Sequence, residues 1–463
     1  MDHPNARSLP SQFLRRFLVG EHLPFTTLLS IEEITRVITE ELGAGINCIY
    51  TPLVTLALFL RQVVDPDHSC QAAVEHLAAA RVAQGLKPCS EDTGAYCKAR
   101  QRLPLSLFQR LVDRTGSRLQ QDAPEPLLFH GRTVKIVDGT GCSMPDSPEN
   151  RREFPLPGGQ KPGVGFPMAR VLLVLSLACG AVLTAAISRC RGKQTGECAA
   201  LRGLHDHFEP GDIALGDSLY GTYLDIALLA ARGVDSIFGL HARRVVDFRR
   251  GQRLGCEDHI VDWVKPRRPA WMDPQTYDAL PATLAIRELR IRVERAGFRT
   301  RVVLIATTLL DATLYSKAEL AGLSRARWHA ELDIRSLKQS LAMDVLRCHS
   351  PEMVSKEIWA HLLAYNLIRT AMAAAALGAG LRPRQLSFQG ARQTLEAFAE
   401  ELTGATAMTF SGQVDLILGR LAAHRVGDRP DRFEPRERKR RPKPSKYMKF
   451  PRKEARRLAA LRD

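Results

Sequence analysis

The chain has 463 residues, of which 45% are hydrophobic, and its 66 Lys and Arg against 50 Asp and Glu give a formal net charge of +16. This length and composition exclude a disordered protein and predict a globular chain of two to four domains. The positive charge is concentrated, because residues 425–463 hold 16 Lys and Arg against 6 Asp and Glu. A concentrated basic tail is typical of proteins that bind a polyanion, and nucleic acid is the first candidate.

Cysteine usage and hydropathy indicate the compartment. Ten cysteines are scattered without a Cys-x-x-Cys pair, and the first 20 residues hold two prolines and several charges in place of a signal peptide. We therefore expect a protein of the reducing cytoplasm without a structural zinc site. The nearly uncharged residues 171–187 are divided by Gly180 into two strand-length pieces, 170–179 and 181–190. They predict a buried β-hairpin, so we expect no membrane contact.

The N-terminal region has a helical pattern in five segments, 31–42, 52–64, 70–85, 90–101 and 105–119. The third and fourth segments have the proportions of a helix-turn-helix pair. The fourth presents the candidate DNA contacts Lys98, Arg100 and Arg102, together with Tyr96. A small helical bundle with an ordinary basic surface is the alternative interpretation.

A different pattern begins at residue 132. A strand-like run, 133–137, ends in Asp138, and after the apolar hairpin a short strand, 213–216, delivers Asp217. Helical segments at 197–207 and 219–232 and a strand at 234–240 complete the order strand, strand, strand, helix, strand, helix, strand. This order predicts an α/β chain with a ribonuclease-H-like core.

A β-rich insertion is predicted before the last helix of that core, from alternating runs at 284–293 and 300–307. The predicted organisation has six parts: a helical DNA-binding domain (1–125), the first part of the core (126–240), the insertion (241–312), the second part of the core (313–378), a helical C-terminal region (379–424) and a basic tail (425–463).

Residues 324–338 predict one helix with Glu331 among cations on a single face. At about 100° per residue, Lys338 lies nearly two turns beyond Glu331, and Arg327 and Arg335 lie one turn to either side. A solvated helix with i,i+4 pairs would place these residues in the same way. Apolar residues on the rest of the circumference are expected to anchor the helix in a core: Trp328, Leu332, Ile334, Leu337 and Leu341.

Asp138, Asp217 and Glu331 are the candidate metal ligands. Carboxylates at strand ends of an open α/β sheet lie where ligands bind, and three hard oxygen donors from separate elements suit Mg²⁺. Alternatives remain for two of them, because Asp138 and Gly139 also form a turn signal and Asp217 could cap a helix that begins near residue 219. Asp212 and Asp333 are rival carboxylates in less suitable positions.

A resemblance to a known family follows from these motifs. Arg327, Glu331 and Lys338 have the spacing Arg-x3-Glu-x6-Lys, and with Asp138 and Asp217 they resemble the DDE transposases of bacterial insertion sequences, in the group bearing the Tyr-Arg-Glu-Lys signature (insertion sequence family four type). The likeness extends over most of the chain. Asp217 and Glu331 are 114 residues apart, which leaves room for the β-rich insertion that this family carries.

The resemblance implies that Asp138, Asp217 and Glu331 bind Mg²⁺ or Mn²⁺, as two ions, and catalyse DNA cleavage and strand transfer. It also implies that Arg327 and Lys338 bind phosphates of the element end, and that a homodimer bridges double-stranded DNA ends and target. One signature position differs, because Ser324 stands where the family has tyrosine. The shorter hydroxyl side chain weakens the expected contact with the DNA end.

Other functions remain open from the sequence. The chain could be a catalytically inactive or domesticated DNA-binding relative, or a structure-selective DNA nuclease on the same fold. Trp263, Trp271 and Tyr277 are candidates for stacking on a flipped base, or else core residues. The basic run 436–441 could be a nuclear localisation signal or a site of phosphate contact.

Overall fold

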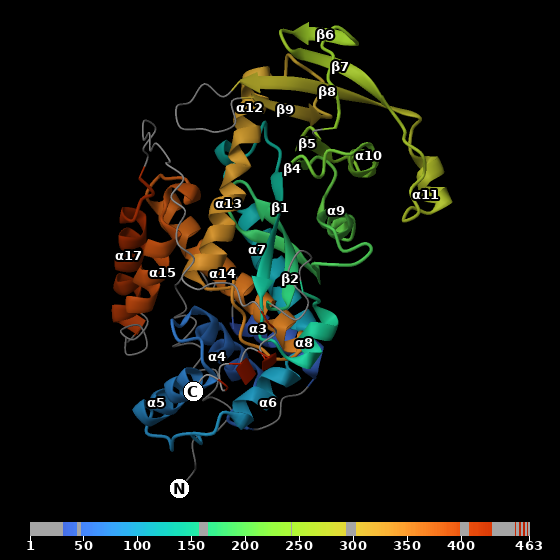
Figure 1. Ribbon diagram of the computed structural model, residues 1–463. Helices are drawn as coiled ribbons and strands as arrows, with labels where there is room; N and C mark the ends of the chain where they lie inside the picture. Colours follow the sequence, from blue (N-terminus) through green and yellow to red (C-terminus); the bar gives the residue numbers. More distant parts are fainter. Residues whose placement is uncertain are drawn as a thin grey trace. The chain divides into compact units, whose positions relative to one another are not determined.

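A 28-residue helix, α14 (Pro351–Gly378), forms the centre of the first of two compact units in the computed structural model (Figure 1). The structure describes residues 31–43, 48–156, 165–241, 243–292, 302–398 and 407–427, and a few residues beyond 449. The first unit comprises Met1–Lys135, Leu173–Ala185 and His329–Val426, and the second comprises the intervening segments and the tail. Strands β1, β2 and β3 contribute residues to both units.

The first unit is mainly helical. Its N-terminal helices are α3 (Ile31–Leu42), α4 (Pro52–Val64), α5 (Cys70–Ala83), α6 (Gly94–Arg102) and α7 (Leu105–Gln121), followed by the 3₁₀ turn η1 (Glu125–Leu127). Its C-terminal part holds α13 (Trp328–Arg335, from His329 onward), the π-helical turn η3 (Ser336–Ser340), α14, the 3₁₀ turn η4 (Pro383–Gln385), α15 (Phe388–Ala397) and α17 (Ala407–Ala423). All five predicted N-terminal helices are confirmed, although α6 begins four residues later than predicted.

Helix α14 is buried on nearly all sides because it packs against α4, α7, α15 and α17. This arrangement explains why the compact units do not follow the predicted linear boundaries: apolar faces at both ends of the chain are buried against the same helix. Asn366 joins α14 to α7 and to the hairpin. Its amide accepts a hydrogen bond from the Val182 amide (2.8 Å) and donates to the Val182 carbonyl (2.8 Å) and the Thr115 hydroxyl (3.2 Å).

The predicted apolar hairpin is confirmed as β2 (Met168–Ser176) and β3 (Val182–Arg189). Its turn is closed by a hydrogen bond from the Ser176 amide to the Ala181 carbonyl (2.9 Å), and Gly180 adopts φ of +78°. That backbone conformation favours glycine. Within the described residues, no helix is both long and apolar enough to cross a membrane.

The second unit is organised around a nine-stranded sheet in the order β3-β2-β1-β4-β5-β9-β8-β7-β6. The remaining strands are β1 (Val134–Ser143), β4 (Ile213–Gly216), β5 (Asp235–Gly239), β6 (Gln252–Gly255), β7 (Asp258–Val264), β8 (Thr283–Arg292) and β9 (Val302–Thr307). Its helices are α8 (Pro148–Glu153), α9 (Glu197–Arg202), the 3₁₀ turn η2 (His205–His207), α10 (Tyr223–Ala230), α11 (Pro274–Ala279) and α12 (Lys317–Ala326). The predicted order from the first strand to β5 is found, except that the short helix α8, which was not predicted, lies between β1 and β2.

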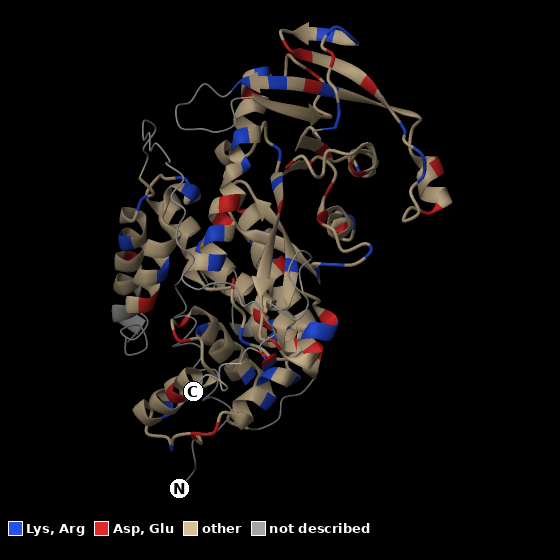
Figure 2. Ribbon diagram, viewed as in Figure 1, with Lys and Arg blue, Asp and Glu red and all other residues tan. Residues whose placement is uncertain are grey.

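Strands are found where the β-rich insertion was predicted, and they continue the main sheet. Strand β5 pairs in parallel with β4 and antiparallel with β9, so the last of the following strands, β9, returns beside β5. Strands β6, β7, β8 and β9 form an antiparallel ladder. Figure 2 shows acidic residues on β7 and both signs of charge on β8. Some of these charges, those of Asp258, Arg287 and Glu288, are buried. Residues 293–301 lie outside the described residues, so the end of one predicted strand and the start of the next are not described.

We expect Asn366→Ala to lower the free energy of unfolding by about 3 kcal/mol, because it leaves a buried amide and a buried carbonyl of Val182 without partners. Urea denaturation followed by circular dichroism would measure the change. Gln389→Ala, at an exposed position in α15, is the control and should change stability by less than about 0.5 kcal/mol. A decrease of less than about 1 kcal/mol for Asn366→Ala would contradict this role.

Candidate active site

Asp138 lies in the middle of β1, which continues to Ser143. The expectation that the strand ends at Asp138 is therefore wrong, and Asp138 and Gly139 do not form a turn. The Gly139 amide donates a hydrogen bond to Asp138 Oδ1 (2.9 Å). Asp138 is half-buried, and burial raises the pKa of its carboxyl group, which Asp217 and Glu197 raise further.

Asp217 follows β4, which is the neighbour of β1 in the sheet. Its Oδ1 accepts a hydrogen bond from the Leu219 amide (2.7 Å), which forms a tight local turn. The alternative role as a helix cap is not observed, because α10 begins only at Tyr223 and is capped by the Thr222 hydroxyl. The adjacent strands therefore bring the Asp138 and Asp217 carboxylates close enough to repel each other.

Glu197 is a third acidic residue of this cluster, and no sequence motif had indicated it. It begins α9, and its Oε2 accepts a hydrogen bond from the hydroxyl of Tyr220 (3.0 Å). Tyr220 is fully buried, and burial followed by the charge of Glu197 raises its pKa strongly. The one sequence signal was Gly139, because a glycine within a strand often marks a close approach by another group.

Arg327 provides a positive charge beside this cluster. Its Nη1 lies 3.5 Å from Asp138 Oδ2. The predicted single helix over 324–338 is divided, because α12 ends at Ala326, Arg327 is its C-cap, and α13 starts at Trp328. Ser324 lies in the last turn of α12, half-buried, and its carbonyl accepts a hydrogen bond from the Arg327 amide (3.3 Å).

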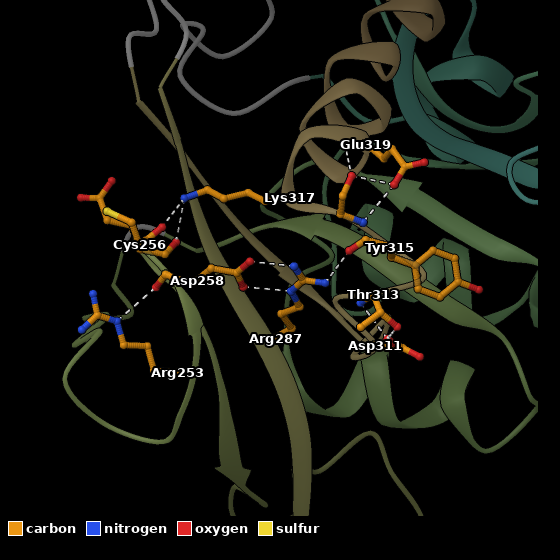
Figure 3. A network of polar contacts seen from close by, with 12 residues as sticks. Arg253, Cys256, Asp258, Arg287, Asp311, Thr313, Tyr315, Lys317 and Glu319 are labelled. Carbon is orange, nitrogen blue, oxygen red and sulfur yellow. Dashed lines mark hydrogen bonds and ion pairs between the residues drawn. The ribbon is translucent and has the colours of Figure 1, made fainter.

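The insertion holds the start of α12 (Figure 3). The guanidinium of Arg287 in β8 donates to both carboxylate oxygens of Asp258 in β7 (2.9 and 2.6 Å) and to the Tyr315 carbonyl (2.7 Å). Lys317, the first residue of α12, donates to the carbonyls of Cys256 (2.6 Å) and Glu257 (3.2 Å) in the turn between β6 and β7.

This anchor is buried, since the side chain of Arg287 is 1% exposed. Ser316 and Glu319 form a capping box at the same end of α12, which satisfies amides that the first helical turn leaves without partners. Buried ion pairs fix geometry more than they add stability. The insertion therefore determines where α12 begins, and α12 in turn delivers Arg327 to Asp138.

Glu331 is exposed in the first turn of α13 and belongs to the first unit. The rival carboxylate Asp333 is buried and is bound by two arginines, Arg369 and Arg384, the latter at 3.0 Å. Burial also lowers the pKa of His329 to about 4, so this neighbour is neutral at pH 7. Asp333 thus anchors the helix and has no capacity left for a ligand, whereas Glu331 faces outward.

The predicted apolar anchor of this helix is partly wrong. Leu337 and Leu341 are buried, but Trp328 and Leu332 are 52% and 40% exposed. The inward face is instead made by Ala330, Asp333 and Leu337, at helical spacing. The ion pairs of Asp333 hold this side chain on the buried face of the helix. A charged residue therefore occupies a face that sequence periodicity predicted to be apolar.

Arg335 and Lys338 also belong to the first unit. Arg335 is exposed, and its Nε donates to Gln339 (2.9 Å). Lys338 lies on the π-helical turn, in which the Leu341 amide bonds to the Ser336 carbonyl (3.2 Å). Because a π turn is wider than an α turn, Lys338 is shifted from the expected two-turn alignment with Glu331. Asp138, Asp217 and Arg327 thus belong to the second unit, whereas Glu331, Lys338 and the further candidate DNA contact Arg335 belong to the first.

Arg100 is wrong as a candidate DNA contact, because it is buried in the first unit. Its guanidinium donates to Gln62 (3.1 Å) and to the Cys70 thiol (3.1 Å), and it lies over the ring of Phe59 (4.9 Å to the centroid). Lys98 and Arg102, on the same helix α6, are exposed.

The three aromatic residues of the insertion differ in their surroundings. Trp263 is 1% exposed and donates its indole hydrogen to Glu288 (2.8 Å), so it is a core residue. Trp271 is half-buried, and the guanidinium of Arg202 lies over its ring, 3.5 Å from the centroid. The ammonium of Lys265 lies over the ring of Tyr277, 4.4 Å from the centroid. Stacking on a base is therefore excluded for Trp263.

Known proteins resemble the chain over most of its length. It is 28% identical over 374 residues to the transposase InsG for insertion sequence element IS4 of Escherichia coli (strain K12), which covers 78% of each chain. A solved piggyBac transposase synaptic complex with hairpin DNA aligns with a TM-score of 0.43 and 10% identity, over 88% of this chain and 85% of that one. Residues 129–367 match the family described as "Transposase DDE domain". The chain therefore belongs to the family of transposases with a DDE domain.

Proposed function

We propose that this protein excises and inserts a mobile DNA element by metal-dependent cleavage and strand transfer at phosphodiester bonds. The observation that carries the proposal is the pair of neighbouring carboxylates, Asp138 and Asp217, with the cation Arg327 beside them in a chain of this family. This arrangement of charges suits in-line attack by an oxygen nucleophile on a phosphodiester.

We also propose that strands β3-β2-β1-β4-β5 form a ribonuclease-H-like core. The support is their order in the sheet, the parallel pairing of β4 with β5, and the helices α9 and α10 between successive strands. In this assignment, Asp138 comes from the central strand and Asp217 from the carboxyl end of its neighbour.

Asp138, Asp217 and Glu331 would hold the divalent cations, Mg²⁺ or Mn²⁺. Within the described residues, no three Asp, Glu, His or Cys side chains already enclose a metal position. Two carboxylates nevertheless fit Mg²⁺, which keeps several waters and is shared with substrate phosphates. Burial, and to a smaller extent the charge of Asp217, raises the pKa of Asp138, so a cation between the two carboxylates would be favourable. When bound, two such ions activate the attacking oxygen and stabilise the leaving oxygen.

The cationic residues would hold DNA phosphates. Arg327 partly neutralises Asp138 in the chain as described, while Arg335 and Lys338 follow Glu331 on α13 and its π turn. Lys98 and Arg102 would contact double-stranded DNA at the element ends from α6. Ser324 would contact the DNA only through the hydroxyl of its short side chain. A homodimer that bridges two ends and the target is part of this proposal.

Asp138→Ala, Asp217→Ala and Glu331→Ala should each lower the cleavage rate by about 10³-fold or more, because each removes a metal ligand worth several kcal/mol in the transition state. Cleavage of DNA fragments that carry the element ends would be measured in Mg²⁺, with end binding followed by gel shift. End binding should be retained. Asp262→Ala, an exposed aspartate of β7, is the control, and retained cleavage in the three variants would refute the proposal.

Asp138→Asn should change how stability depends on pH in the absence of divalent cations. Burial raises the pKa of Asp138, so its stabilising proton is fully present below the unfolded pKa of about 3.9 and is lost as pH rises through the higher folded pKa. The neutral variant avoids that loss and should therefore lose less free energy of unfolding than the wild type between about pH 4 and 7. Parallel curves, or an equal effect of Asp262→Asn, would contradict this expectation.

Removing the basic tail should weaken DNA binding and flatten its salt dependence, by about 0.9 in log–log slope for each phosphate that the tail neutralises in the intact chain. The truncation belongs after Gly427, because the Val426 amide donates to the Gln385 carbonyl (2.7 Å) and Arg425 pairs with Leu386. A full-length chain with the Lys and Arg of residues 436–441 changed to Gln tests charge apart from length. An unchanged slope in both would assign the tail another role.

A further inference from the structure

Each of the two aspartates is next to a glycine whose missing side chain leaves space for another residue. A Cβ atom on Gly139 would lie 2.5 Å from Cδ of Glu197 and 2.7 and 2.8 Å from its oxygens. A Cβ atom on Gly216 would lie 2.7 Å from the ring of Tyr220. Neither glycine has a positive φ. At Gly216 the space is taken by the ring of Tyr220, whereas at Gly139 it is taken by the end of the Glu197 side chain, which would have to move to admit a Cβ atom. The two glycines are thus favoured for space and not for an unusual backbone conformation.

The two residues that fill these spaces are bonded to each other. The hydroxyl of Tyr220 donates to Glu197 Oε2 (3.0 Å), and the other oxygen of Glu197 lies 3.6 Å from Nε of Arg170. Arg170 also donates to the Thr195 carbonyl (2.9 Å), just before α9. Glu197 is thus held from two sides, with its carboxylate pressed against the backbone beside Asp138.

The loop that follows Asp217 is held by the same helix and by β5. The thiol of Cys198 donates to the Leu219 carbonyl (3.3 Å), and a Cβ on Gly221 would lie 2.4 Å from the Gly239 carbonyl oxygen at the end of β5. The ring of Tyr220 packs on Phe238 with 5.9 Å between centroids. The loop therefore has little room to move relative to α9.

We propose that Glu197 and Tyr220 are positioning residues that set the spacing between Asp138 and Asp217. The link runs from Asp138 through the backbone of Gly139 to Glu197, then to Tyr220, and through Gly216 to Asp217. This inference rests on the proposed function, in which the two aspartates share divalent cations. Without the link, the repulsion between the aspartates would spread β1 and the loop apart, and cations would bind more weakly.

The first test compares Tyr220→Phe with Tyr223→Phe, a matched control three residues away. Tyr223 is also buried and donates its hydroxyl to a carbonyl, that of Pro281 (2.5 Å), but it touches neither aspartate nor Glu197. Each variant keeps the ring and removes one hydrogen bond, so the two should be destabilised to a similar extent. Only Tyr220→Phe should affect cation binding.

Three quantities would be measured on the full chain: Mn²⁺ affinity without DNA, by electron paramagnetic resonance; the Mg²⁺ dependence of end cleavage; and end binding by gel shift. Tyr220→Phe should weaken Mn²⁺ binding and raise the half-saturating Mg²⁺ concentration by about 10-fold, with end binding unchanged. Tyr223→Phe should match the wild type in all three. Equal behaviour of the two variants in Mn²⁺ affinity and Mg²⁺ dependence would overturn the inference.

Glu197 is tested by two substitutions. Glu197→Gln keeps an oxygen that accepts from Tyr220 and should retain near wild-type Mn²⁺ affinity, whereas Glu197→Ala should weaken it as Tyr220→Phe does. If Glu197→Gln weakens Mn²⁺ binding as much as Glu197→Ala, the charge acts directly and the positioning role is overturned. Failure of the proposed function is separate, because it would appear as a wild type without Mg²⁺-dependent cleavage, while Mn²⁺ affinity still compares the variants.

Discussion

Electrostatic repulsion between two carboxylates is the constraint on which the second unit depends. Asp138 and Asp217 come from neighbouring strands, and burial removes part of the water that would screen them. The surrounding chain offers compensation in the Gly139 amide and the guanidinium of Arg327. Glu197 and Tyr220 also connect the two backbone segments, so that the two carboxylates keep a fixed distance despite their repulsion.

Two buried clusters of ion pairs hold the helices α12 and α13. Arg287 and Asp258 fix the start of α12, and Asp333 with Arg369 and Arg384 fixes the rotation of α13. Burying such charges brings little net stability, but it penalises every alternative arrangement that would separate them. The break between the helices, at Arg327, lies between these two anchors along the chain, so each helix is oriented by its own partners.

Most elements of the fold could be predicted from periodicity and turn residues, because hairpins, buried strands and amphipathic helices leave local patterns. Less of the candidate site could be predicted from the sequence. Asp138 lies in the middle of a strand. An aspartate followed by a glycine is a turn signal in sequence, but here the glycine makes room for a tertiary contact. Arg100 and Asp333 are charged yet buried, and their partners are distant in sequence. Glu197 left no pattern of its own, because its role depends on Tyr220 and Gly139, which only the folded chain brings together.

The contact between Gly139 and Glu197 also has an evolutionary consequence. A side chain at position 139 would meet the carboxylate of Glu197, which would have to move away from its present bond with Tyr220. Substitution at position 139 therefore depends on how freely the side chain at position 197 can move. Related chains that keep this arrangement should consequently vary at these two positions together, which would leave a pair of covarying columns joining β1 to the start of α9.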